Sequence, residues 1–402
     1  MSPLDTTRRG FGHVLAAGAL TAGAPLLARG QAKSRIAMFV TLSGPLGALV
    51  KPNVYAADLA VKVAQQQGVS AEVQMIDDEG NPGRAAPKLI SAIQNDGIRL
   101  FAGAVLSPVG LMMSAEVNRA NGVYSSSVGA DELTGSACNK STFRWPVPSF
   151  GAIEQSLRPI IAELPNAKRW YTVTPKYVFG EGMLAATQRI LKEKGIEHVG
   201  NSYHGLTDTE FSGLIPGIAA AKPDVLVFLN FGPQSDALLR QVASFGLKAK
   251  MKIVIPYSGG LDQFQGLGSD LLESVYLGAQ YYHDINEAGN KRLVEYFKKE
   301  ANKLPSYAAV NIYSVTSLIC RGIKAAGTAD PAAVIKALEG LSYDDGATGL
   351  ETVRASDHQV LKNYYLLKGK AKAAKKYEDD FAEIISFGKS FEDPAASKCK
   401  MA

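Results

Sequence analysis

Several short stretches carry residue types found in enzyme active sites, but each lacks a partner that its chemistry requires. Gly388-Lys389-Ser390 has the end of a phosphate-binding loop, yet Glu383 stands where that loop needs its first glycine. Pro256-Tyr257-Ser258-Gly259-Gly260 has proline where the turn around a nucleophilic serine needs glycine. The sequence therefore predicts a protein that is not an enzyme and that uses no cofactor.

Metal-ligating patterns are equally incomplete. The histidines after residue 32 are scattered and lack the ligand spacing of a zinc site: His198, His204, His283 and His358. Asp77-Asp78-Glu79 is an acidic triplet without the alternating ligands of a calcium loop, and a solvated turn explains it better. We expect no metal site.

Polar and small residues follow two predicted strands in the first half of the chain. Leu106 and Ser107 come after one strand, and Pro108 then suits the first turn of a helix. The loop Ser127-Val128-Gly129-Ala130 follows the next strand. Helix N-termini offer unpaired N–H groups and a positive dipole, so both loops can hold a carboxylate. Ser107 is also a plausible helix N-cap, a role compatible with ligand binding.

Aromatic residues follow strands in the second half of the chain. Single aromatic residues at such positions usually belong to a hydrophobic core, but here three successive loops carry them. This pattern favours an apolar pocket wall with a few polar groups. The candidate residues are Tyr177, Phe179, Asn230, Phe231, Tyr257 and Ser258.

These loops require a parallel sheet to position them, and the chain shows the expected alternation of strands and helices. Near-continuous apolar strands at 35–41, 71–77, 99–103 and 122–127 are separated by helical stretches. Two prolines within 142–148 interrupt the pattern, which then repeats with strands at 168–174, 196–203, 224–230 and 251–257. We predict an α/β fold of two similar lobes with doubly wound, mainly parallel sheets joined at a hinge. A strand at 274–280, helices at 287–302, 307–326 and 331–341, strands at 350–355 and 361–367, and a polar tail complete the prediction.

The first 32 residues have the pattern of an export signal. Arg8 and Arg9 precede an apolar run over 14–27, and small residues at 28–32 offer a cleavage region. The paired arginines resemble a bacterial twin-arginine signal. The apolar run is too short for a membrane-spanning helix, which needs about 20 residues. We expect an exported protein that does not span a membrane after cleavage.

Composition and cysteines narrow the possibilities further. The net charge of +5 is mild, and no basic run with interleaved aromatic residues suggests nucleic-acid binding. Cys320 lies in an apolar helical stretch and is predicted to be buried. Cys138 and Cys399 lie in polar surroundings, and an oxidising compartment permits a disulfide. We predict that these two pair and fasten the C-terminal tail to the first domain.

Several motifs together resemble one protein family over nearly all of residues 34–370. They are Thr41-Leu-Ser-Gly-Pro45, Ile76-Asp-Asp78, Asp131-Glu-Leu-Thr134, Phe179-Gly-Glu-Gly182 and Leu238-Leu-Arg-Gln241. The chain is similar to periplasmic solute-binding proteins of the branched-chain amino acid type, which serve ABC importers. The resemblance implies two lobes with three hinge crossings that close on a ligand, an inner-membrane ABC permease as partner, and a periplasmic location.

The resemblance also implies boundaries and site residues. The first lobe would comprise 33–146 plus 281–345 and the second 147–280 plus 346–380, with 381–402 packing back on the first lobe. Ser107 and the loop 127–130 would hold a ligand carboxylate. Phe179 stands where many members have a ligand-contacting tyrosine, and Leu49 stands where others have an aromatic residue.

Two departures from the family bear on the ligand. Amino-acid-binding members place a glutamate near Ser258-Gly259, but here no acid precedes Asp262. The segment Pro148-Ser149-Phe150 also lacks an acid that members commonly have. Since a buried ammonium without a counter-charge is costly, an aromatic, keto or hydroxy acid is favoured over a branched-chain or other amino acid.

Two other functions remain open at this point. A ligand-sensing receptor domain of the same fold would accompany a signalling kinase, whereas a transport protein would accompany a permease and an ATPase. A secreted enzyme acting on a small organic acid would need a nucleophile paired with a base, and the sequence shows no such pair. We expect a monomer.

Overall fold

The computed structural model describes residues 33–44, 46–394 and 397–401, and the first lobe is built around a sheet. The predicted export signal lies outside these residues. Five parallel strands have the order β2-β1-β3-β4-β5. The order reverses between β1 and β3, so the loops that follow these strands diverge and leave a crevice. The strands are β1 (Ser34–Val40), β2 (Ala71–Asp77), β3 (Leu100–Gly103), β4 (Val123–Ser126) and β5 (Thr142–Arg144).

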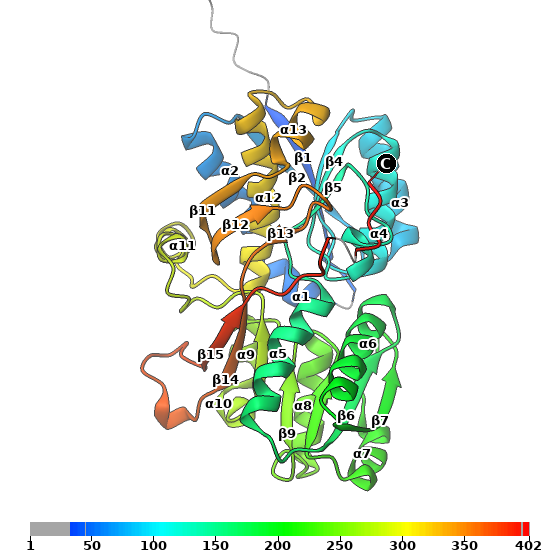
Figure 1. Cartoon of the computed structure of the whole chain (residues 1–402). Coiled ribbons are helices and arrows are strands. Elements are labelled where there is room, and N and C mark those ends of the chain that lie inside the picture. Colours follow the sequence, from blue (N-terminus) through cyan, green and yellow to red (C-terminus); the bar gives the residue numbers. More distant parts are fainter. Residues whose placement is uncertain (1–32, 45, 395–396, 402) are drawn as a thin grey trace, which may run out of the picture. The chain divides into compact units, whose positions relative to one another are not determined.

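Helices cover both faces of this sheet, as the apolar strands require. Strands β3 and β4 are buried throughout. In Figure 1, α2 (Tyr55–Gln66), α12 (Tyr307–Ala326) and α13 (Pro331–Leu338) lie on one side of the strands, and α3 (Pro82–Gln94) and α4 (Ser107–Arg119) on the other. The short α1 (Gly47–Val50) and a 3-10 turn (Lys51–Asn53) follow β1.

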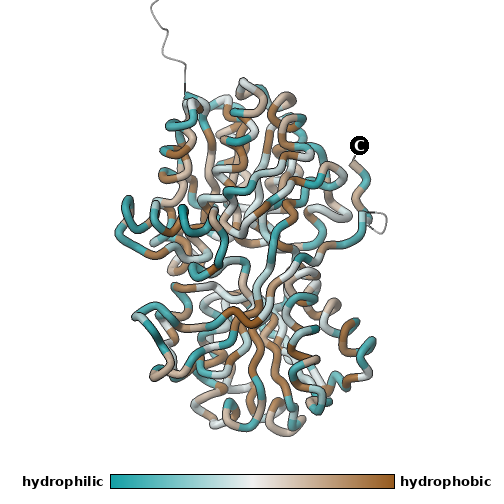
Figure 2. Tube along the Cα trace, turned by 60° about the vertical axis from the view of Figure 1, so that its left-hand side comes forward, coloured by the Kyte–Doolittle hydropathy of each residue, from teal (hydrophilic) through white to brown (hydrophobic). Residues whose placement is uncertain are grey.

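The second lobe repeats the pattern with a seven-stranded sheet of order β15-β14-β10-β9-β8-β6-β7. Five parallel strands are β6 (Arg169–Pro175), β7 (Glu197–His204), β8 (Val225–Phe228), β9 (Lys252–Ile255) and β10 (Tyr276–Ala279). The helices are α5 (Ser149–Glu163), α6 (Val178–Glu193), α7 (Ile215–Ala221), α8 (Pro233–Ser244), α9 (Leu261–Leu267) and α10 (Ser269–Leu272). Figure 2 shows hydrophobic residues along the central strands of the second lobe, whereas the surrounding helices mix hydrophobic and hydrophilic residues. The predicted two-lobed, mainly parallel α/β fold is confirmed.

The third crossing between the lobes lies later in the chain than predicted. The chain crosses after β5 at 145–148, after β10 at 280–287 and after β13 at 362–363. A small antiparallel sheet of β11 (Ser342–Gly346), β12 (Gly349–Val353) and β13 (Val360–Leu361) precedes the last crossing and packs against α11 (Ala288–Ala301). Gln359 forms a bridge with Arg144 at the end of the first-lobe sheet. Residues 346–361 therefore accompany the first lobe, not the second.

The C-terminal segment differs from the predicted tail. Strand β14 (Tyr364–Gly369) pairs antiparallel with β10, and β15 (Ala382–Gly388) pairs antiparallel with β14 at the edge of the second-lobe sheet. Residues 382–388 thus extend the second lobe instead of packing on the first. After the buried Ala382, exposed residues alternate with half-buried ones, and this pattern did not distinguish the edge strand from a polar tail.

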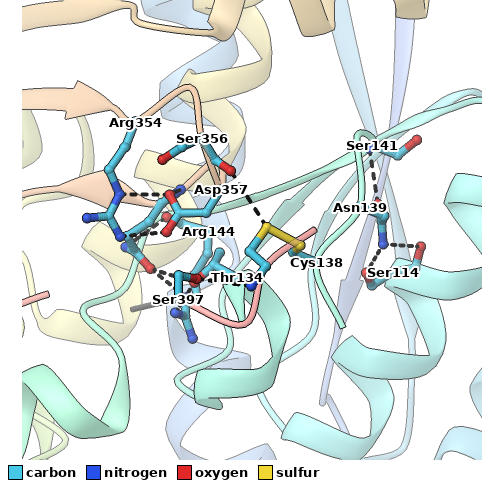
Figure 3. The surroundings of a disulfide bond; sticks show 12 residues. Ser114, Thr134, Cys138, Asn139, Ser141, Arg144, Arg354, Ser356, Asp357 and Ser397 are labelled. Carbon is cyan, nitrogen blue, oxygen red and sulfur yellow. Dashed lines mark hydrogen bonds and ion pairs between the residues drawn. A yellow bond between two sulfur atoms is a disulfide. The ribbon is translucent and has the colours of Figure 1, made fainter. Parts of the chain in front are cut away.

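Only the residues after β15 return to the first lobe. Cys399 and Cys138 form the predicted disulfide, with Cα atoms 5.4 Å apart (Figure 3). The Arg354 guanidinium donates to the carbonyl of Glu392 at 2.9 Å and holds the returning segment against the loop before β13. Cys320 is a free, buried thiol, as expected.

Candidate ligand-binding site

A small cavity of about 20 Å³ lies where strand-end loops of the two lobes meet. The first lobe contributes residues from the loops after β1, β3 and β4, and the second lobe contributes residues after β6, β8 and β9. Eight of the predicted site residues line it: Leu106, Ser107, Ser127, Gly129, Tyr177, Phe179, Phe231 and Tyr257. The structure therefore brings most of the predicted residues together at one cleft.

The first-lobe wall presents hydrogen-bond donors. Ser107 is the first residue of α4, and its hydroxyl does not cap the helix, because the N-cap position is Leu106 without a side-chain bond. Among the described residues, no protein group engages the hydroxyls of Ser107 and Ser127 or the N–H groups of Gly129 and Ala130. The helix N-terminus adds a positive dipole. This wall can hold an anion.

The carbonyl groups of the same loop already accept hydrogen bonds. Ser149 donates to the Gly129 carbonyl through its N–H at 2.9 Å and its hydroxyl at 3.0 Å. The buried Arg144 guanidinium donates to the Ala130 carbonyl and to the hydroxyl of Thr134. These bonds engage the carbonyls of Gly129 and Ala130 and leave the N–H groups of the same residues without a partner among the described residues.

A partly buried carboxyl, that of Asp131, follows this loop in the chain. Asp131 Oδ1 accepts from the N–H of Phe150 at 3.1 Å, near the start of α5, and so links the two lobes. Burial raises the pKa of Asp131 to about 6, while the charge of Arg144 acts in the opposite direction. Neither side chain lines the cavity.

The second-lobe wall is aromatic. Tyr177 is the N-cap residue of α6, and Phe179 lies in the first turn of that helix. The Tyr257 ring packs edge-on against Phe179 at 5.1 Å and against Phe231 at 5.7 Å between ring centroids. Edge-to-face contacts of this kind hold the rings in fixed orientations. The wall is therefore a rigid apolar surface.

Five predicted residues do not line the cavity, because a strand-end position does not determine where a side chain points. Leu49 lies close to Gly232 across the lobe boundary. Val128 packs against Gly110 of α4, and the carbonyl of Ala130 receives Arg144. Asn230 donates to His204 Nε2 at 3.2 Å within the second lobe, and the Ser258 hydroxyl donates to the Gly278 carbonyl at 2.8 Å.

Three lining residues were not predicted from the sequence: Leu46, Val105 and Tyr307. Tyr307 is the first residue of α12, a helix of the first lobe that follows the second hinge crossing. The start of this helix was predicted correctly, but nothing local in the sequence shows that it opens onto the cleft. Leu46 and Val105 lie in the loops after β1 and β3. Both loops were already expected to contribute to the site, so these two residues could have been included as neighbours of the predicted ones.

The described residues that line the cavity include no acidic, basic or histidine side chain. The nearest candidate acid from the sequence, Asp262, instead accepts a hydrogen bond from Asn53 Nδ2 at 2.7 Å across the lobe boundary. No group of three or more potential metal ligands occurs among the described residues. In that same part of the chain, no helix is long and apolar enough to cross a membrane.

The sequence is similar to those of known binding proteins. The family model described as periplasmic binding protein matches residues 33–375. The leucine-, isoleucine-, valine-, threonine- and alanine-binding protein of Pseudomonas aeruginosa is 25% identical over 311 residues, covering 75% of this chain and 79% of that protein. A Leu/Ile/Val-binding protein of Rhizobium johnstonii is 26% identical over 349 residues, covering 84% and 91%.

Solved structures agree with this relationship. An amino acid ABC transporter substrate-binding protein from Pseudomonas fluorescens Pf-5 is 46% identical, with a TM-score of 0.86 and coverage of 91% of this chain and 98% of that one. A solute-binding protein from Rhodopseudomonas palustris BisB5, solved with 3,4-dihydroxybenzoic acid, is 21% identical and has the same fold, with a TM-score of 0.78 and coverage of 91% and 99%. The chain therefore belongs to the periplasmic binding protein family.

Proposed function

We propose that the protein captures a small organic acid without an α-amino group between its two lobes and delivers it to the permease of an ABC importer. The observation that carries this proposal is the composition of the cavity: donors on one wall, aromatic rings on the other and no charged side chain among the described residues that line it. Aromatic, keto and hydroxy acids fit this composition. Amino acids, to which the names of several relatives refer, are the alternative.

Charge balance separates the two ligand classes. A carboxylate would be stabilised by the hydroxyl and N–H donors of the first lobe and by the N-terminus of α4. An ammonium group would need a buried acceptor or counter-charge, and burying it without one is costly. Asp262, the acid nearest in sequence to the family's glutamate position, is already engaged by Asn53.

Ligand entry would require the lobes to separate. A cavity of about 20 Å³ has room for little more than one water molecule, whereas ligand pockets are typically roughly 300–1,000 Å³. Hinge motion at the three crossings would open the cleft, and a ligand that touches both walls would shift the population toward closure. Two solute-binding proteins of this fold have been solved with benzoate and with 4-hydroxybenzoate, which supports the proposal that a protein of this fold can bind an aromatic acid.

A thermal-shift panel tests the proposal. Each amino acid is paired with the keto acid of the same carbon skeleton: leucine with 4-methyl-2-oxopentanoate, and phenylalanine with phenylpyruvate. Benzoate and 4-hydroxybenzoate complete the panel. Since a ligand bound only by the folded state raises apparent stability, we expect the acids without an amine to raise the melting temperature and the amino acids to leave it unchanged. Strong stabilisation by leucine without stabilisation by its keto acid would refute the ligand assignment.

The same proposal includes the location and the assembly of the protein. We expect export through the signal at 1–32 by the twin-arginine route and a monomer in the periplasm. Replacing Arg8 and Arg9 with lysine should leave uncleaved precursor in the cytoplasm, as judged by fractionation and mass spectrometry. Processing that continues unchanged would exclude this route.

A further inference from the structure

The side chain of Gln280 joins two hinge crossings at the back of the cavity. Gln280 is fully buried and begins the second crossing, directly after β10. Its Oε1 accepts from the N–H of Val147 at 2.9 Å, and its Nε2 donates to the carbonyl of Val147 at 2.8 Å. Val147 belongs to the first crossing. Because a backbone N–H can only donate and a carbonyl can only accept, these two bonds fix the orientation of the carboxamide.

The same carboxamide determines the direction of a hydrogen bond in the cavity. The second N–H of Gln280 Nε2 donates to Tyr257 Oη at 2.8 Å, so the phenol oxygen must act as acceptor there. The hydrogen of the Tyr257 hydroxyl then needs another acceptor. Tyr307 Oη is 3.4 Å away, beyond the usual 2.5–3.0 Å of an O–H···O bond. This long contact is weak, so a ligand oxygen at the usual O–H···O distance would be the better acceptor for the Tyr257 hydrogen.

Tyr257 also remains a donor at any physiological pH. Burial and the neighbouring Tyr307 and Tyr364 hydroxyls raise the pKa of Tyr257 well above its usual value of 10.0. The phenol therefore stays protonated.

The Tyr257 hydroxyl lies beside the loop that carries the unpaired N–H groups. A Cβ atom built on Gly129 would lie 3.2 Å from Tyr257 Oη, although Gly129 belongs to the first lobe and Tyr257 to the second. Ser107, Ser127 and Tyr257 line the same small cavity. A carboxylate held by the first-lobe donors would thus have this second-lobe donor within reach.

We infer that Tyr257 donates a hydrogen bond from the second lobe to the ligand carboxylate, and that Gln280 is a positioning residue that directs this bond and ties it to the hinge. The inference rests on the proposed function. It gives closure a physical cause, because the anion receives donors from both lobes only when they are together. The donor role of Tyr257 also requires that the part of the ligand near Gly129 is a hydrogen-bond acceptor.

Titration calorimetry on Tyr257→Phe tests the inference, with benzoate or 4-methyl-2-oxopentanoate as the probe, whichever the wild-type protein binds more tightly. Loss of one hydrogen bond to a charged group should weaken binding about 10- to 100-fold. Tyr364→Phe is the matched control. Tyr364 is buried beside Tyr257, with ring centroids 6.2 Å apart, but it donates to the Pro256 carbonyl and does not line the cavity. We expect this control to change Kd less than about twofold.

A second comparison separates a direct bond from a packing effect. The primary amide of the same probe lacks the negative charge, so Tyr257→Phe should weaken the acid by a larger factor than the amide. Gln280→Met should weaken the acid in the wild-type background and much less in the Tyr257→Phe background, because the two residues act through one bond. Equal losses for acid and amide, or additive losses in the double variant, would overturn the inference.

The outcomes distinguish the two proposals. If the wild-type protein binds no carboxylate at all, the proposed function fails and the inference fails with it. If the wild-type protein binds a carboxylate and Tyr257→Phe binds it within about twofold of the wild-type Kd, the inference alone fails. Reduced affinity in Tyr257→Phe and unchanged affinity in Tyr364→Phe would support it.

Discussion

Replacing Gly129 with alanine should weaken ligand binding while leaving the unliganded protein stable. A Cβ atom at this position would lie 3.1 Å from Phe179 Cε2 and 3.2 Å from Tyr257 Oη, both in the opposite lobe. These separations are shorter than ordinary van der Waals contact, so the closed arrangement must give way. Gly129 does not have a positive φ, so alanine introduces no backbone strain.

The magnitude follows from where the extra methyl group is accommodated. Overpacking a closed interior costs about 1–3 kcal/mol, and here only the closed form carries that cost, because separating the lobes relieves the contact. The affinity should therefore fall about 5- to 150-fold, since each 1.4 kcal/mol is a factor of ten. The free energy of unfolding without ligand should change by less than about 0.5 kcal/mol.

Calorimetry with the best carboxylate of the panel, together with urea unfolding in its absence, measures both quantities. Gly213→Ala is the control, because a Cβ atom on Gly213 would meet no other atom within 4 Å and Gly213 has no positive φ. This control should bind like the wild-type protein. Unchanged affinity in Gly129→Ala would show that the methyl group does not lie between the lobes. A large loss of stability without ligand would show that the contact is not relieved by opening.

Two further predictions concern stability. Replacing Cys138 and Cys399 with serine should lower the free energy of unfolding by about 2–4 kcal/mol, because the disulfide closes a loop with a sequence separation of 261. Dithiothreitol should destabilise the wild-type protein and leave the stability of the variant unchanged. An equal effect of dithiothreitol on both proteins would contradict the prediction. Burial lowers the pKa of Lys362 from 10.5 to about 7, so between these values the unfolded chain binds a proton that the folded protein does not. The free energy of unfolding of the wild-type protein, measured in urea, should therefore increase as the pH rises from 7 to 9, and Lys362→Met should lack the part of that increase due to Lys362. If the free energies of unfolding of both proteins have the same pH dependence, the pKa of Lys362 is not lowered.

The sequence predicted those strands and helices that are marked by a hydrophobic pattern within their own residues. Strands such as β8 and β9 are short apolar runs bounded by helical stretches, and their buried positions in a parallel sheet follow from that pattern. Strand β15 was missed because an edge strand is only half-buried and its partner, β14, has no sequence signature that indicates a neighbour.

The site could be predicted as a set of loops but not as a set of side chains. Tyr177, Phe179 and Tyr257 line the cavity, whereas Asn230 and Ser258 point into the second lobe and bond to groups there. The two outcomes arise from equivalent strand-end positions, so the difference lies in the tertiary packing. Gln280 shows the same limit, because its role depends on Val147 and Tyr257, which are distant in the sequence.

The disulfide between Cys138 and Cys399 also changes the covalent topology of the molecule. All three hinge crossings, at 145–148, 280–287 and 362–363, lie between the two cysteines. The bond therefore closes the chain into a ring that contains every connection between the lobes. A single proteolytic cut in any crossing would open this ring without dividing the molecule, and the two fragments would separate only after reduction. The two lobes thus stay covalently joined after one break in any hinge segment.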